Sequence, residues 1–256
     1  MEVHHHHHEP HSHKKWHHYF WEFLMLFLAV FCGFLAENFR EHQVEHQREK
    51  RYMENLIQDL SRDTATIADR NAFQKRAVIY ADSLVFLVNS AEKSTYLSEI
   101  YYYARILAIL KTYQYSNATV TQLKNSGSLR LIRKEFIADS ILQYDMRQQQ
   151  VLTVDANITE TLRDFRVSMS RVFDALTLRN MIDLSNMRGE KGFGEFVTKP
   201  QKPTPLITED KTLINELCMN ANFLMTLYQN ELKVMSSLAN KATRLIELIK
   251  KEYHLE

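Results

Sequence analysis

The sequence predicts an all-α protein in which an N-terminal transmembrane helix continues into an up-and-down bundle of long helices, of the four-helix type. Three observations predict this fold class. Glycine and proline, which weaken helices, occur only five and four times in 256 residues. An uninterrupted apolar block extends from Phe23 to Ala36. Beyond this block, apolar residues recur at steps of three and four, which places them on one face of a helix.

Residues 1–15 are predicted to form a histidine-rich flexible tail. Neutral imidazoles at such density bind zinc, nickel or copper to some degree, but a flexible run fixes no coordination geometry. A solvated tail or a purification tag explains the run more simply than a metal role in the cell. We therefore predict no metal site and keep, as weak candidate ligands only, His4, His5, His6, His7, His8, His11 and His13.

Residues 16–39 are predicted to form the transmembrane helix. The apolar block alone covers about 21 Å, whereas the helix from Trp16 to Phe39 reaches about 36 Å and can span a hydrocarbon layer of roughly 30 Å. Amphipathic aromatic rings settle at the level of the lipid headgroups. The residues predicted to anchor the helix in the membrane are Trp16, Tyr19, Trp21, Phe23 and Phe39.

Two other interpretations of this segment are weaker. A cleaved signal segment needs small residues at its exit, but Phe34 and Leu35 stand there. A helix of a soluble core does not explain the aromatic residues, lysines and histidines gathered directly before the block.

The side of the membrane is harder to predict. Lys14 and Lys15 precede the span and four basic residues from Arg40 to Arg51 come after it, which favours a cytoplasmic body. A short basic tail before an apolar block is, however, the layout of a signal anchor that exports the remainder of the chain. We expect a single-pass protein of the bacterial inner membrane with a periplasmic body.

Residues 40–184 are predicted to form the first part of the bundle. The first helix should continue without a break to about Asn89, and further helices should cover about 96–115 and 132–183. Between these two lies a short helix that begins at Ser116 or Asn117 and is terminated by Gly127. Residues 185–208 form a loop that contains glycine and proline, and residues 209–256 form the closing helix of the same bundle, which begins after Thr208.

Signatures of catalysis are sparse. From Lys50 onward the sequence has only one histidine, His254, and one cysteine, Cys218, so nucleophilic triads lack a base. Asp59 and Asp63 lie one helical turn apart among arginines, which we interpret as a solvated charged surface. The 32 basic and 31 acidic residues nearly cancel, which argues against a nucleic-acid partner. We predict no catalytic residue, no cofactor and no cofactor-binding site.

Two candidate interaction surfaces are better supported. Ala29, Gly33 and Ala36 form a stripe of small residues that would let a second membrane helix approach closely, although glycine is also simply tolerated in spans. Tyr101, Tyr102 and Tyr103 are consecutive and, at about 100° per residue, cannot all face one core. We expect them to contribute to an interface, because tyrosine is enriched there.

Three stretches resemble a known family: HHYFWEFLMLFLAVFCGFLAE in the anchor, EHQREKRYMENLIQDLSRDT after it, and TVTQLKNSGSLRLIR around Gly127. They are similar to a family of uncharacterised single-pass bacterial membrane proteins with an N-terminal anchor and a helical domain. The resemblance implies an anchor with a helical body, no catalytic residue, and a native histidine-rich start.

The first hypothesis for function is therefore a membrane-anchored helical scaffold or interaction protein without catalytic activity. Its partners would be the lipid bilayer and either further copies of itself or another membrane protein; the sequence leaves a small-molecule ligand open. The alternative is an extracytoplasmic four-helix sensor subunit that signals through a partner protein. A membrane enzyme, the third hypothesis, would need a cluster of polar residues on the inward helix faces.

Overall fold

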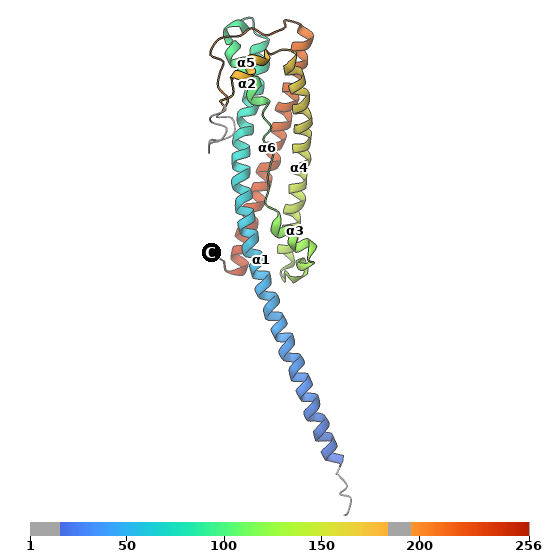
Figure 1. Cartoon of the computed structure of the whole chain (residues 1–256). Coiled ribbons are helices and arrows are strands. Elements are labelled where there is room, and N and C mark those ends of the chain that lie inside the picture. Colours follow the sequence, from blue (N-terminus) through green and yellow to red (C-terminus); the bar gives the residue numbers. More distant parts are fainter. Residues whose placement is uncertain (1–15, 184–195, 256) are drawn as a thin grey trace, which may run out of the picture. The chain divides into compact units, whose positions relative to one another are not determined.

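The computed structural model describes residues 16–183 and 196–255. These residues form an all-α fold dominated by three long helices, α1 (Trp16–Val88), α4 (Glu135–Ser170) and α6 (Lys211–Tyr253) (Figure 1). The shorter helices are α2 (Leu97–Leu107), α3 (Ala118–Asn125) and α5 (Ala175–Asn180), with 3-10 turns at Lys93–Tyr96 and Ser128–Leu131. The chain divides into two compact units between Arg51 and Tyr52. We call residues 16–51 the N-terminal unit and the described residues from Tyr52 onward the helical body.

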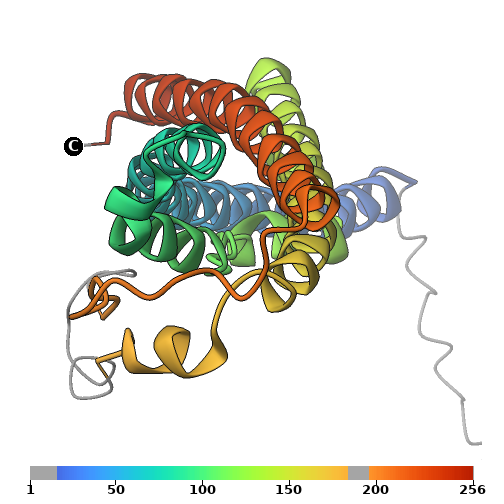
Figure 2. The same cartoon turned by 90° about the horizontal axis from the view of Figure 1, so that it is seen from above.

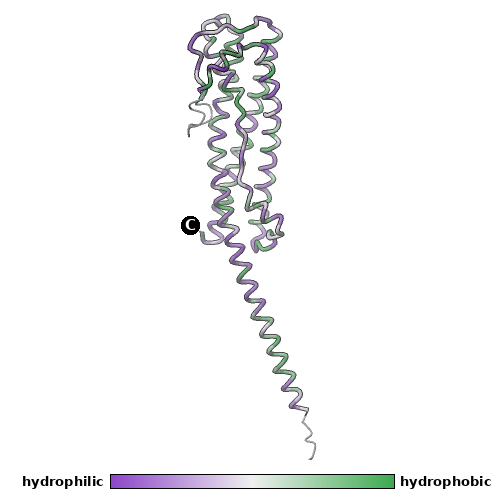
Figure 3. Tube along the Cα trace, viewed as in Figure 1, coloured by the Kyte–Doolittle hydropathy of each residue, from purple (hydrophilic) through white to green (hydrophobic). Residues whose placement is uncertain are grey.

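The N-terminal unit consists of the first part of α1. It contains an 18-residue window with a mean hydropathy of 2.0, none of which is buried. Figure 3 shows this hydrophobic stretch along the helix. A core helix of a soluble protein would have most of such a window buried. By its length and composition, this helix could cross a membrane.

In the helical body, α1, α4 and α6 run side by side (Figures 1 and 2). Their inward faces form two separate hydrophobic clusters. The first contains residues from Phe73 to Val88 of α1, together with α2, the second half of α4 and the first half of α6. The second contains residues from Met53 to Ile67, together with α3, the first half of α4 and the second half of α6. The part of the interior that lies between Ile67 and Phe73 of α1 therefore belongs to neither hydrophobic cluster.

The structure confirms the unbroken first helix, which ends at Val88. It also confirms the left-handed conformation of Gly127, whose φ is +65°. The helix predicted over about 96–115 is too long, because α2 ends at Leu107. Arg166 of α4 donates two hydrogen bonds to the carbonyl oxygen of Ala108, at 2.9 Å from Nε and 2.6 Å from Nη2. This tertiary contact holds the carbonyl group at the point where the helix stops.

The helix predicted over 132–183 is also interrupted, because α4 ends at Ser170 and α5 comes next. Asp174 begins α5 as its N-cap, with its carboxylate accepting a hydrogen bond of 2.7 Å from the backbone N–H of Thr177. The closing helix α6 has Asp210 as its N-cap in the same way, two residues after Thr208. Of the predicted loop 185–208, residues 185–195 lie outside the described residues.

Candidate functional site

Three charged side chains meet inside the helical body at the level between the two hydrophobic clusters. Arg70 comes from α1, Asp155 from α4 and Glu231 from α6, so each long helix contributes one. The side chains of Arg70 and Glu231 are 2% and 0% exposed, and that of Asp155 is 13% exposed. We call these three residues the charged triad.

The guanidinium group of Arg70 binds both carboxylates of the charged triad. Its Nε and Nη2 each donate a hydrogen bond of 3.2 Å to Glu231, and Nη2 also donates one of 2.7 Å to Oδ1 of Asp155. A planar guanidinium suits this arrangement because it presents several donors in a fixed fork. Burial raises the pKa of both Glu231 and Asp155, although the charge of Arg70 opposes that rise.

The chemistry of the charged triad constrains how the helices pack. A buried ion pair adds little net stability, but separating its partners leaves an uncompensated charge in an apolar interior. Because each helix supplies one member, sliding any long helix by one turn would break the set. The triad therefore favours one register of α1, α4 and α6 over its alternatives.

Asp59 and Asp63 form a second buried polar group on α1. The prediction that they lie on a solvated charged surface is wrong. Both are buried, with 6% and 1% of their surface exposed. Asp63 accepts hydrogen bonds from the hydroxyl of Tyr144 at 2.6 Å, the amide of Gln148 at 2.8 Å and the backbone N–H of Ser116 at 2.6 Å. Burial raises the pKa of Asp63, and the bonds from Tyr144 and Ser116 act against this rise.

These two aspartates hold the start of α3. Asp59 accepts a hydrogen bond of 3.0 Å from the backbone N–H of Thr119, in the first turn of that helix. The residue that precedes α3, Asn117, makes no capping bond through its own side chain. The N-terminus of α3 is therefore capped by α1, from about 60 residues away in the chain.

The predicted membrane-anchor residues Trp16, Tyr19, Trp21, Phe23 and Phe39 are all exposed on α1. The small residues Ala29, Gly33 and Ala36 lie on the same exposed stretch, and a Cβ atom added at Gly33 would meet nothing within 4 Å. Contact of these residues with lipid, or with a second helix, stays a prediction.

The three consecutive tyrosines of α2 have different surroundings. Tyr101 is fully buried, its ring 4.9 Å from that of Phe173, and its hydroxyl donates to the carbonyl of Pro205 and accepts from the N–H of Asp174. Tyr102 and Tyr103 are half-buried, and the ring of Tyr103 stacks on Tyr80 with 4.9 Å between centroids. Tyr101 thus lies inside the body, and only Tyr102 and Tyr103 present part of their rings at its surface.

The candidate metal ligands His4, His5, His6, His7, His8, His11 and His13 lie outside the described residues. Within residues 16–183 and 196–255, no group of three or more His, Cys, Asp and Glu side chains is arranged to hold a metal ion.

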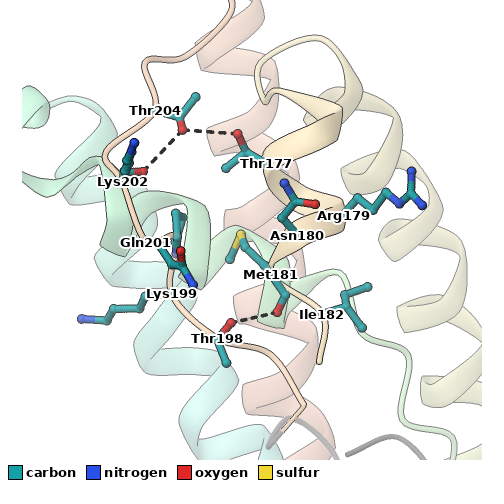
Figure 4. A pocket seen from close by; sticks show the side chains of 11 residues that line it. Thr177, Arg179, Asn180, Met181, Ile182, Thr198, Lys199, Gln201, Lys202 and Thr204 are labelled. Carbon is teal, nitrogen blue, oxygen red and sulfur yellow. Dashed lines mark hydrogen bonds between the residues drawn. The ribbon is translucent and has the colours of Figure 1, made fainter. Parts of the chain in front are cut away.

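A pocket of about 800 Å³ lies between α5 and residues 198–204 (Figure 4). Its lining combines Asn180, Gln201 and three threonines around Met181 with three basic residues, Arg179, Lys199 and Lys202. Figure 4 shows the side chains of Arg179 and Lys199 extending away from its centre. Lys199 is engaged by Glu99, at 2.8 Å. Because the described lining holds three basic residues and no carboxylate, the pocket suits a neutral or anionic polar group better than a cation.

Comparisons with known proteins returned nothing similar: no protein-family model matches the chain, and no curated protein or solved structure does. The function of the chain is therefore inferred from its own residues.

Proposed function

We propose that this chain is a membrane-anchored helical scaffold, an interaction protein without catalytic activity that assembles with further copies of itself. The observation that carries the proposal is an apolar stripe on the outward face of α1 in the helical body. Ile79 is 61% exposed and Phe86 is 72% exposed, and Ala65 and Ala72 precede them as exposed residues at the same seven-residue spacing. We call these four residues the outer stripe.

The outer stripe supplies one of the two apolar positions per heptad of a helix-association surface. Side chains at a spacing of seven residues line up along one face of a helix, and the positions between them, Ala68, Lys75 and Asp82, are exposed as well. The opposite face of α1 is already used by the two hydrophobic clusters. A second copy of the chain fits the outer stripe, because a symmetric dimer pairs one patch with the same patch. Pairing would remove Ile79 and Phe86 from water, which is favourable.

The helical body would act as a rigid platform for this assembly. We infer that α2, the residues after it and α3 together take the place of the fourth helix in an up-and-down bundle. The capping of α3 by Asp59 and the bonds from Arg166 to Ala108 support this, because they tie both ends of that irregular element to long helices. The charged triad would keep the platform in a single register.

The proposal places the chain in the bacterial inner membrane as a single-pass protein with a periplasmic body. The unburied hydrophobic window of α1 supports the membrane location. In the membrane, the small-residue stripe of Ala29, Gly33 and Ala36 would allow a second contact between two copies. The proposal includes no nucleic-acid partner and no cofactor.

Disulfide cross-linking in membranes tests the assembly. In a chain with Cys32→Ser and Cys218→Ala, the variants Ile79→Cys and Phe86→Cys should each form a linked dimer on mild oxidation. Met146→Cys is the matched control, because Met146 is 60% exposed but lies on α4. A linked dimer from the control as well would indicate random collision. Monomers from both α1 variants would overturn the proposed assembly.

A sensor subunit that signals through a partner protein is the second candidate function. The pocket between α5 and residues 198–204 favours it, because its volume is in the range of small-molecule sites. Thermal unfolding of the full chain with a panel of neutral and anionic polar metabolites tests this function. Stabilisation that is lost in Asn180→Leu would support the sensor, and a flat response across the panel would count against it.

A further inference from the structure

Two arginines, Arg105 of α2 and Arg166 of α4, line a second cavity in the helical body. Its volume is about 260 Å³. The remaining lining is mostly apolar and consists of Ala108, Met169, Ser170, Phe173, Ala175 and Leu178. Met169 and Phe173 are buried, at 4% and 2% exposed, so they form a fixed apolar wall.

In the described part of the chain, no ion pair balances the positive charges of the two arginines. Among the residues that the structure describes, neither Arg105 nor Arg166 takes part in an ion pair. Arg166 directs Nε and Nη2 to the carbonyl of Ala108, which is neutral. The Nε of Arg105 is buried and has no hydrogen-bond partner. Burial and the neighbouring charge of Arg166 both lower the pKa of Arg105.

Among the described residues, the acidic side chains near this cavity in the sequence have partners of their own. The carboxylate of Asp174, next to Phe173 in the chain, accepts two hydrogen bonds of 2.7 Å from Thr177 at the start of α5. Asp164 and Glu160 on α4 face Arg163, which is exposed. An unpaired buried N–H and two like charges beside one cavity are unfavourable, and an anion in the cavity would offset part of the charge.

We propose that this cavity binds a small organic acid through its carboxylate, with an aromatic or aliphatic body against Met169 and Phe173. The two oxygens of a carboxylate match the fork of a guanidinium and can accept hydrogen bonds from both arginines, which lowers the net charge of the site from +2 to +1. The small volume restricts the ligand to a short chain or a single ring. This binding role goes beyond the proposed scaffold and does not depend on it.

Calorimetry on the full chain in nanodiscs of zwitterionic lipid tests the proposal, with phenylacetate and hexanoate as probes. Both should bind and raise the melting temperature. Three control compounds each lack one of the two required features. Acetate and inorganic phosphate are anions without an apolar body, and benzylamine has the aromatic body with a positive charge. All three should bind at least about tenfold more weakly than phenylacetate. Equal binding of acetate or phosphate and phenylacetate would overturn the ligand class.

Arg105→Gln should weaken phenylacetate binding by about tenfold to a hundredfold, since it removes a charged hydrogen-bond donor. It should also raise the melting temperature of the ligand-free chain, because it relieves the repulsion with Arg166. A merely structural arginine would lower that temperature. Arg163→Gln is the matched control on α4, where the side chain is 72% exposed, and should change neither quantity.

Arg105→Lys is a second variant in case the glutamine variant does not fold. It keeps the charge but loses the fork, so it should bind phenylacetate more weakly than the native chain while folding normally. Native affinity in either variant would overturn the proposal. Neither result bears on dimer formation through the outer stripe, so the two proposals fail separately.

Discussion

Arg70 of α1 and Glu231 of α6 form an ion pair with 3.1 Å between Nη2 and Oε1, and both side chains are buried. The pair lies where the two hydrophobic clusters of the body end, between Ile67 and Phe73 on α1. With Asp155 it places one positive and two negative formal charges in the interior. The pair thus joins two helices that are far apart in the sequence at one defined level.

Arg70→Met should destabilise the helical body by about 3–5 kcal/mol, because two buried carboxylates lose their only cation in the triad. The measurement is chemical denaturation of the full chain in detergent, monitored by circular dichroism. Arg76→Met, at an exposed position of the same helix, should change the free energy of unfolding by less than about 0.5 kcal/mol. Equal effects of the two variants would contradict a structural role for the triad.

Removing the whole triad should be far less harmful than removing Arg70 alone. In the triple variant Arg70→Met, Asp155→Leu, Glu231→Leu no buried charge of the triad remains, so stability should return to within about 2 kcal/mol of the native chain. If the triad sets the register, the triple variant should also show a broader unfolding transition. A sharp transition at native stability would show that the triad is not needed to set the helix register.

The positions of these polar residues explain how much of the interior is predictable from the sequence. Met53, Leu56, Leu60 and Ile67 form the buried apolar stripe of this part of α1, at steps of three, four and seven. Asp63 lies between Leu60 and Ile67 and Arg70 follows Ile67, so the complete series runs at steps of three and four. Their place on the apolar face was thus a signal that they are buried, and it outweighs the nearby charges that suggested a solvated surface. What the periodicity cannot show is the partner, because Tyr144 and Glu231 lie on other helices.

Helix ends were predictable only where the cause is local. Gly127 and the start of α6 near Thr208 depend on adjacent residues, and both were predicted to within a few positions. The end of α2 depends on Arg166, about 60 residues later, and the end of α4 leads into the contact of Tyr101 with Asp174. Tertiary hydrogen bonds of this kind leave no pattern in the local sequence.

Asp63 should make stability depend on pH. Its pKa is raised in the folded chain above the unfolded value of about 3.9, so the folded state holds this proton more tightly. The contribution of Asp63 to the free energy of unfolding should therefore be fully present at low pH and be lost as pH rises through the raised pKa. Asp63→Asn should reduce this loss, and Asp82→Asn, at an exposed position, should leave it unchanged. Identical pH profiles for all three chains would exclude the effect.

Tyr101→Phe should lower the free energy of unfolding by about 1–3 kcal/mol. The substitution keeps the edge-to-face contact with Phe173 but leaves the N–H of Asp174 and the carbonyl of Pro205 without the hydroxyl. Thermal unfolding measures the change. Tyr103→Phe is the control, because its half-buried ring stacks on Tyr80 and should tolerate the loss of the hydroxyl. If Tyr103→Phe lowered the free energy of unfolding more than Tyr101→Phe, the hydroxyl of Tyr103 and not that of Tyr101 would be the one that stabilises the fold.

Labelling of a single added cysteine should show which side of the membrane holds the helical body. Gln201 is exposed in the described segment that leads to α6, so Gln201→Cys should react with a membrane-impermeant maleimide. Cys32 and Cys218 are first replaced, as in the cross-linking chain. In intact spheroplasts, a periplasmic body predicts labelling equal to that in lysed cells. Because a charged maleimide does not cross the bilayer, labelling only after lysis would place the body in the cytoplasm and reverse the proposed orientation while leaving the anchor in place.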